Sequence, residues 1–284
     1  MDLAALVHQA IPLATIISLT ALGEVYLERA GRVNLGLEGI LYIGYSASAL
    51  ASVYAGSLLV GLASSLVATL SMSLIFFLLV EILRVDQAIV GLALVFTGIG
   101  LGDALGVSSK GLAGPMLSHS SALLLEILAL LALPVASYIL LQRTWLGLVV
   151  RSAGEDEESA RYMGVPLAKV RLLALIVESI LVSLASLYFY AYYSSGAWRA
   201  GRPLGLGWLS LGMVILGYWN PIGVAISSLL LGVLYSLRPL MPAIGIPNQV
   251  ADAVPYAVVV VALVIASWIY RRTGYRPPAL VWKV

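Results

Sequence analysis

Glu24, Asn34 and Glu38 lie inside, or at the edges of, two long apolar stretches near the N-terminus. Carboxyl and amide groups in such places usually face a cavity or a partner, because an acid within a membrane helix costs about 2.5–3.5 kcal/mol on insertion scales. Gly36 lies between them and allows the backbone to unwind, which membranes tolerate only where it lines protein or water. This pattern predicts a discontinuous helix along a path for a polar solute.

A simpler interpretation of the same segment is a turn at the membrane surface. Glu28 and Arg32 have the i,i+4 spacing of an ordinary ion pair, and Arg29 would be solvated beside them. We expect these three residues to belong to a solvated loop. For Asn34 and Glu38 both interpretations stay open.

A second polar cluster, residues 152–166, combines acidic residues with helix-ending signals. Ser152 and Glu155 have the spacing of a capping box, in which each side chain satisfies a free amide at a helix start. Gly164, with a proline two residues later, would end the helix. The segment predicts a short helix between two membrane spans. It would serve either as a docking site for a cytoplasmic partner or as a soluble linker.

The elements that must hold these residues follow from composition. Hydrophobic residues make up 61% of the 284 residues, charged residues only 11%, and mean hydropathy is +1.00. A soluble domain of this length normally has about a quarter of its residues charged. Too little polar surface remains to cover a water-facing shell, so the sequence predicts an all-α, polytopic integral membrane protein.

A bilayer needs about 17–25 apolar residues per helix. About nine spans are expected, with a range of eight to ten. The candidates are 9–27, 35–53, 57–81, 86–106, 121–142, 172–193, 205–219, 221–237 and 254–270. The segment 205–219 is short and rich in glycine, so it could instead be a half-span or one arm of a hairpin that turns at Asn220.

The orientation follows from the basic residues, which concentrate in cytoplasmic loops. Placing loop 143–171 in the cytoplasm puts twelve of the sixteen Lys and Arg residues inside, the C-terminal tail included. The N-terminus is then external, and its first apolar stretch is interpreted as a retained span. We expect a single transmembrane domain over 1–284, with a cytoplasmic loop at 143–171.

Nine spans divide as four, one and four, so the second four would run opposite to the first. Such inverted repeats are common in transporters. One short echo exists, because the tetrapeptide at 29–32 (RAGR) recurs at 199–202, and the two copies fall on opposite predicted faces.

The sequence lacks the residues and motifs that several kinds of chemistry require. The sequence has no cysteine, and its two histidines are far apart, so no metal site is expected. No phosphate-binding glycine loop and no nucleophile motif occurs. We therefore predict no catalytic residue, no cofactor on this chain and no nucleic-acid partner.

The run at 28–39, ERAGRVNLGLEG, resembles the ERAGVVNIGLEG signature of ABC-transporter permeases for nucleosides. These belong with the branched-chain amino acid and simple-sugar permeases. Similar segments follow in order at 87–98, 145–155, 200–202, 219–221 and 255–256. The chain departs from the pattern after Arg202, where Pro203 and Leu204 replace a small or aromatic pair, and in its short segment near 106–120.

The resemblance implies a multi-pass permease of the cell membrane in a binding-protein-dependent importer. The implied partners are an ATP-binding cassette ATPase that uses ATP and Mg, a second permease, identical or different, and an extracytoplasmic substrate-binding protein. The resemblance implies Asn34, Glu38 and Asn220 as path residues and Gly154, Glu155, Ala160 and Gly164 as ATPase-coupling residues. To these candidates we add Glu24, Gly36 and Trp219 for the path and Ser152 for the coupling site, from their types and positions in the sequence.

The expected function is import of nucleosides. Simple sugars or branched-chain amino acids are alternative substrates of the same class of permease. An ion-coupled secondary transporter is the alternative from another class, with Glu24, Glu38 and Glu178 as its candidate ion-binding acids.

Overall fold

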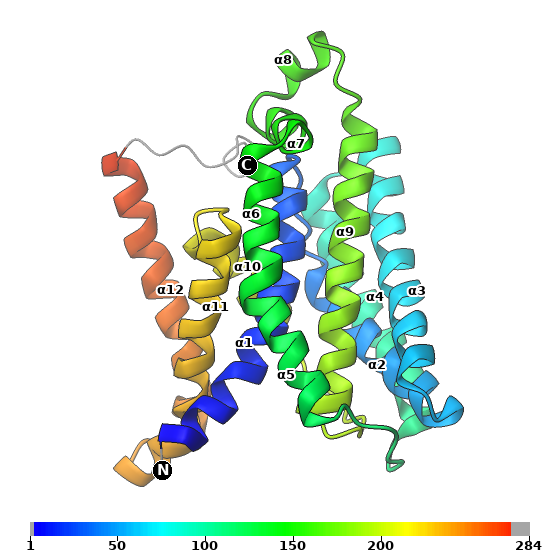
Figure 1. Ribbon diagram of the computed structural model, residues 1–284, viewed down its shortest axis with the longest axis vertical. Coiled ribbons are helices and arrows are strands. Elements are labelled where there is room, and N and C mark those ends of the chain that lie inside the picture. Colours follow the sequence, from blue (N-terminus) through cyan, green and yellow to red (C-terminus); the bar gives the residue numbers. More distant parts are fainter. Residues whose placement is uncertain (1–2, 274–284) are drawn as a thin grey trace.

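The computed structural model of the chain describes residues 3–273, and every regular element within that range is a helix (Figure 1). The α-helices are α1 (Leu3–Arg29), α2 (Leu37–Ala55), α3 (Leu58–Phe77), α4 (Gln87–Gly106), α5 (His119–Ile127), α6 (Leu133–Arg143), α7 (Trp145–Glu155), α8 (Glu157–Tyr162), α9 (Leu167–Tyr188), α10 (Leu206–Leu216), α11 (Pro221–Ser236) and α12 (Asn248–Thr273). The all-α prediction is confirmed for the described residues.

Three of the long helices contain a π-helical turn. It extends α3 as η1 (Leu78–Ile82), joins α5 to α6 as η3 (Leu128–Ala132) and extends α9 as η4 (Phe189–Tyr193). Such turns are rare and occur often at functional sites. Two short 3-10 elements, η2 (Val107–Ser109) and η5 (Arg238–Ile244), follow α4 and α11.

Seven helices in the described part of the chain are long and apolar enough to cross a membrane. They correspond to seven of the predicted spans, and the count of about nine is not confirmed. The remaining two segments are helical but differ from simple spans. α2 is 19 residues long and almost wholly buried, whereas α10 has only 11 residues and is too short to cross a bilayer.

The polar segments gather at the two ends of the bundle. Figure 1 shows α7 and α8 at one end, which we call the α8 end, and the start of α1 at the opposite end. Arg32 and Arg171, both predicted to be cytoplasmic, form ion pairs with α8 and so share an end, while the membrane orientation itself stays a prediction. Arg202 lies at the opposite end, where it lines the same cavity as Gln9 of α1. The two RAGR copies therefore lie at opposite ends, as expected, while the inverted repeat itself stays a prediction.

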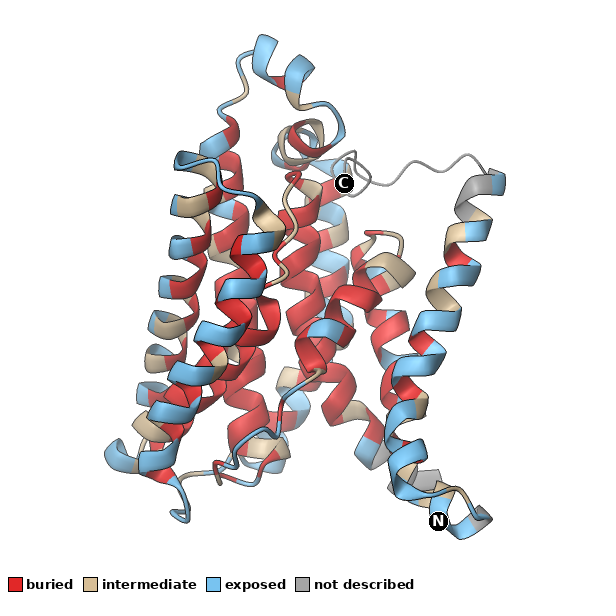
Figure 2. Cartoon of the chain, turned by 180° about the vertical axis from the view of Figure 1, so that it is seen from behind, coloured by how far each residue is buried: buried red, intermediate tan, exposed pale blue. Residues whose placement is uncertain are grey.

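Helix α1 runs through the core, packed against α9, α10 and α11. Figure 2 shows buried residues concentrated in the middle of the bundle and exposed ones along the outer helices, including α12. An apolar exterior is expected where lipid replaces water as the solvent.

Glycines let α2 approach α4 closely. A Cβ added to Gly98 would overlap the backbone of Gly39, and one added to Gly39 would overlap the backbone of Leu94 and Val95. Small residues permit this approach in membranes, where packing drives helix association. Gly100, on the same helix, would meet no atom within 4 Å.

Candidate translocation path and coupling site

The starts of α2 and α10 meet inside the bundle. The chain leaves α1 at the α8 end and runs without regular structure until α2 begins beside Gly91 and Leu94 of α4, one to two turns into that helix. The start of α10 reaches the same place, because a Cβ on Gly207 would overlap the backbone of Glu38. The backbone is thus unwound before α2, as expected for this segment, and α10 is short; that these elements act as discontinuous membrane helices stays a prediction.

Glu38 joins the two helix starts. Its carboxylate accepts hydrogen bonds from the backbone N–H groups of Gly205, Gly207 (2.7 Å) and Trp208 (3.2 Å). The first N–H groups of a helix have no partner within it, and the carboxylate supplies one. Glu38 is buried, so it is not a solvated surface residue.

Asn34 connects the unwound segment to two long helices. Its backbone N–H donates to Glu24 Oε1 (2.8 Å), and its side-chain amide donates to Glu178 Oε1 (3.0 Å). Its own oxygen accepts from the N–H of Gly36 (3.0 Å), where a Cβ would come within 2.9 Å of that oxygen. Four of the predicted path residues thus lie along one buried polar segment.

The other two predicted path residues lie at the turn between α10 and α11, nearer the α8 end. Asn220 Oδ1 accepts from the N–H of Ile222 (2.9 Å) and so caps α11. Trp219 has a left-handed backbone, and its indole N–H donates to Glu28. Arg29 donates to the Trp219 carbonyl (3.0 Å). The prediction that Glu28, Arg29 and Arg32 form a solvated loop is wrong, and the pair Glu28–Arg32 does not form.

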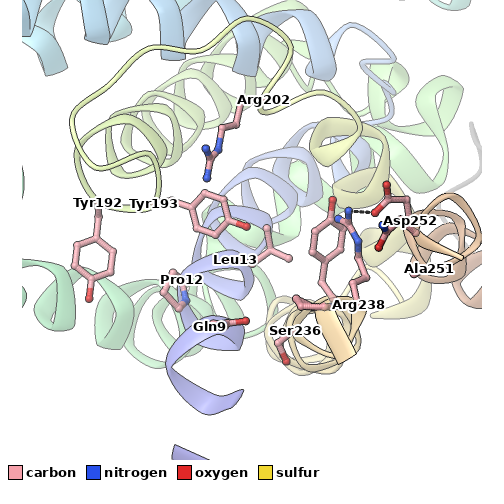
Figure 3. A pocket seen from close by; sticks show the side chains of 13 residues that line it. Gln9, Pro12, Leu13, Tyr192, Tyr193, Arg202, Ser236, Arg238, Ala251 and Asp252 are labelled. Atoms are coloured by element: carbon pink, nitrogen blue, oxygen red, sulfur yellow. Dashed lines mark hydrogen bonds and ion pairs between the residues drawn. The ribbon is translucent and has the colours of Figure 1, made fainter. Parts of the chain in front are cut away.

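An open cavity of about 670 Å³ lies at the end opposite α8, between the start of α1, η4, η5 and the start of α12 (Figure 3). The Arg202 guanidinium lies 5.8 Å from the centre of the Tyr193 ring, and the Arg238 guanidinium lies 4.3 Å from that of Tyr235. Arg238 also pairs with Asp252. Aromatic faces beside charged groups suit a flat polar solute.

The helix expected within 152–166 exists but begins elsewhere. Ser152 is inside α7, where its hydroxyl donates to the Val149 carbonyl, so the capping box predicted for it is wrong. The N-cap of α7 is Thr144, and that of α8 is Asp156, whose carboxylate accepts from the Ser159 N–H (3.0 Å). Asp is a stronger N-cap than Thr, so α8 has a stronger cap than α7.

The five predicted coupling residues differ in exposure. Glu155 and Gly164 are exposed, and Gly164 has a φ of 80° just after α8. Gly154 and Ala160 are buried, and a Cβ on Gly154 would overlap the Arg29 carbonyl. Ser152 is half-buried. Tyr162 and Met163, beside them, are apolar and exposed, but the sequence pattern did not identify them as candidate docking residues.

An ion network ties α8 to the rest of the molecule. Arg171 is almost fully buried and donates to Glu81 of η1 (3.0 Å), to Glu157 of α8 (2.9 Å) and to the Ala30 carbonyl (3.2 Å). Arg32 pairs with the same two carboxylates. The network lines a cavity of about 600 Å³ at the α8 end. It joins α8 to α9, η1 and the unwound segment before α2.

Glu157 gives this network a pH dependence. Burial raises the pKa of its carboxyl, but the hydrogen bond and charge of Arg171, with the charges of Arg32 and Arg161, outweigh burial and lower it below its ordinary value. A lowered pKa stabilises the folded state above the unfolded value of about 4.3, and this contribution is lost as pH falls through the folded pKa. We expect the melting temperature to drop more steeply below about pH 4.3 in the wild type than in Glu157→Gln.

Thermal melts at a series of acidic pH values test this expectation. Glu158→Gln is the matched control, since its side chain is exposed on the same helix. Parallel curves for the wild type and Glu157→Gln would contradict it.

These observations define the class of the protein. Seven long apolar helices lie with the largely buried helix α2 and the short helix α10, which meet around polar groups, and transporters often place such groups within a helical bundle. The family model described as branched-chain amino acid transport system / permease component matches residues 7–263, and the chain belongs to that family.

Curated relatives fall within the ABC permeases. The chain is 30% identical over 257 residues to the "Putative glucose ABC transporter permease protein TsgC13" of Haloferax volcanii, covering 83% of this chain and 77% of that one. It is 28% identical to the nucleoside ABC transporter permease protein NupC of Lactococcus lactis, covering 89% of each chain. It is 29% identical to the guanosine ABC transporter permease protein NupQ of Bacillus subtilis, covering 86% of each.

Proposed function

We propose that this chain is the membrane-spanning permease subunit of an ATP-driven importer for nucleosides. The meeting of α2 and α10 around Glu38 supports the proposal, because irregular backbone and polar groups there are buried within the helical bundle, as along the substrate path of many transporters. The solute would enter from the cavity beside Tyr193 and leave at the α8 end.

The nucleoside assignment is supported by two of the relatives and by the open cavity. Tyr193 and Tyr235, each with an arginine over one ring face, leave the other face for stacking of a base, and Asp252, which pairs with Arg238, would also accept hydrogen bonds from ribose hydroxyls. Import of a simple sugar is the second candidate, favoured by the relative named for glucose, because tyrosine faces and carboxylates also suit sugar rings.

ATP would be hydrolysed, with Mg, by a separate cassette subunit that docks at the α8 end. The exposed residues Glu155, Tyr162 and Met163 form the surface we assign to it. Gly154 and Ala160 would instead seat the segment on the permease. The ion network would pass movement of α8 to the unwound segment. A second permease subunit and an external binding protein would complete the complex.

Uptake by cells that express the complete transporter tests the proposal. Radiolabelled nucleosides, glucose and branched-chain amino acids are supplied with and without an ionophore. We expect nucleoside uptake to continue after the ion gradients collapse and to stop when ATP is depleted. Uptake that requires the gradients would support ion coupling instead, and preferential glucose uptake would select the sugar alternative.

Glu38→Gln tests the path within the same assay. The amide keeps the size of the carboxylate but loses its charge, and hydrogen bonds to a charged group contribute about 1.5–3 kcal/mol each. We expect uptake to fall much more than the amount of protein in the membrane, because the start of α10 loses its anchor. Uptake equal to that of the wild type at equal expression would remove Glu38 from the path.

A further inference from the structure

Glu24 on α1 and Glu178 on α9 are carboxyl groups with no exposed surface. Their helices pack closely, since a Cβ on Gly23 would lie 2.9 Å from Glu178 Cα. Asn34 donates one hydrogen bond to each, from its backbone N–H to Glu24 and from its side-chain amide to Glu178, so the two carboxyl groups are neighbours around one residue.

Counting donors shows what this pair lacks. Among the described residues, Glu24 Oε2 and Glu178 Oε2 have no hydrogen-bond partner. An ionised carboxylate only accepts hydrogen bonds, whereas a protonated carboxyl donates one. Two ionised carboxylates in contact, away from water, repel each other and lose their hydration. A single proton removes the repulsion and supplies the missing donor.

The surroundings do not supply a positive charge instead. The charged groups on α1, α9 and the described elements packed against them, with Glu81 added because Arg171 pairs with it, are Glu28, Arg29, Glu38, Glu81, Glu126, Arg151, Glu155, Glu157, Glu158, Arg161, Lys169 and Arg171. Lys169 is exposed, at the start of α9.

Among the described residues, Arg171 and Arg29 contact groups other than Glu24 and Glu178. Arg171 pairs with Glu81 and Glu157, and Arg29 donates to the carbonyls of the α10–α11 turn. Within the part of the chain that the structure describes, neither Glu24 nor Glu178 forms an ion pair with a basic side chain. That part also holds no group of three or more acidic or histidine side chains that could bind a metal ion.

We infer that Glu24 and Glu178 together bind one proton, shared between their two carboxyl groups. With one proton bound, the pair carries a single negative charge. Asn34, which donates hydrogen bonds to both carboxyl groups, then anchors the unwound segment before α2 to the pair. This inference goes beyond the proposed function, since it depends only on the buried pair and holds for any transported solute.

Infrared spectroscopy of the full-length chain in lipid bilayers at neutral pH tests the inference. A protonated carboxylic acid has a carbonyl stretching band separate from those of carboxylates and amides. We expect Glu24→Gln and Glu178→Gln each to lose the same component of that band. In each variant the new amide supplies the donor, so the remaining acid ionises. The double variant should lose no more than either single variant.

Glu38→Gln is the matched control, because three backbone N–H groups already solvate that carboxylate. Its protonated-acid band should equal that of the wild type. Unchanged bands in both single variants of the pair would overturn the inference. A band loss in the double variant twice as large as in either single variant would also overturn the inference, because it would mean that the pair binds two protons. A component that appears only after sodium is removed would assign the pair to a cation and would also overturn it.

Discussion

Gly98→Leu is expected to prevent α2 from packing against α4 and so to abolish correct assembly. The new side chain would have to occupy the space filled by the backbone of Gly39, and backbone atoms cannot rotate away as a side chain can. Overpacking costs about 1–3 kcal/mol in cores that can adjust, and occasionally more. We expect the upper end here, because α2 also holds Glu38 against α10.

Size-exclusion chromatography and thermal melting of the detergent-solubilised protein measure this effect. Gly100→Leu, on the same helix, is the control, because a Cβ there meets open space. We expect it to elute and melt like the wild type. If the two variants behaved alike, the close approach of α2 and α4 would not be needed for assembly.

Arg171→Met is expected to lower stability sharply and to disconnect α8 from the membrane helices. Only 2% of the Arg171 side chain is exposed, and its loss leaves the buried carboxylate of Glu81 with Arg32 as its remaining partner. Breaking a buried pair from one side costs about 3–5 kcal/mol. If the proposed function holds, substrate-stimulated ATP hydrolysis by the complex should be lost as well.

Arg161→Met provides the matched comparison. Arg161 also pairs with Glu157 (2.9 Å), but 69% of its side chain is exposed, and an exposed pair contributes about 0–1 kcal/mol. Adding Glu81→Gln to Arg171→Met should recover part of the lost stability, because it removes a buried carboxylate that has lost one of its two arginines, while Arg32 keeps Glu157 (3.6 Å) as a partner. Equal melting temperatures for the two single arginine variants would show that the buried network does not hold α8 in place.

The helices could be predicted from the sequence because lipid imposes one rule on every span. Apolar length alone located α3, α4, α9 and α11, and the short segment at 205–219 was identified as a possible half-span for its glycines. What stays unconfirmed is the number of crossings. α2 and α10 begin inside the bundle, and a hydropathy pattern does not report the depth at which a helix starts.

Two predictions from short sequence spacings, a capping box and an i,i+4 ion pair, are wrong because contacts with distant parts of the chain, or a different helix start, take their place. Ser152 and Glu155 have capping-box spacing, yet the helix begins at Thr144, so the same residues lie in its later turns. Glu28 and Arg32 have ion-pair spacing, but each finds a partner far along the chain, in Trp219 and Glu81. Pairings between residues 49 to 191 positions apart leave no periodic trace in one sequence.

The buried polar segment was partly foreseen. Glu24, Asn34, Gly36 and Glu38 stood out because polar groups and glycines are costly in apolar stretches. Their partners on α9 and α10 could not be assigned, since the backbone N–H groups of residues 205–208 carry no side-chain signature.

The way α2 and α10 start from a common point has a consequence for selectivity. Each helix carries a partial positive charge of about half a unit at its N-terminus. Two such ends facing one carboxylate sum to about zero, so the field at the junction largely cancels. If the proposed path passes this junction, an uncharged solute would cross it without the electrostatic barrier that a cation or an anion would meet.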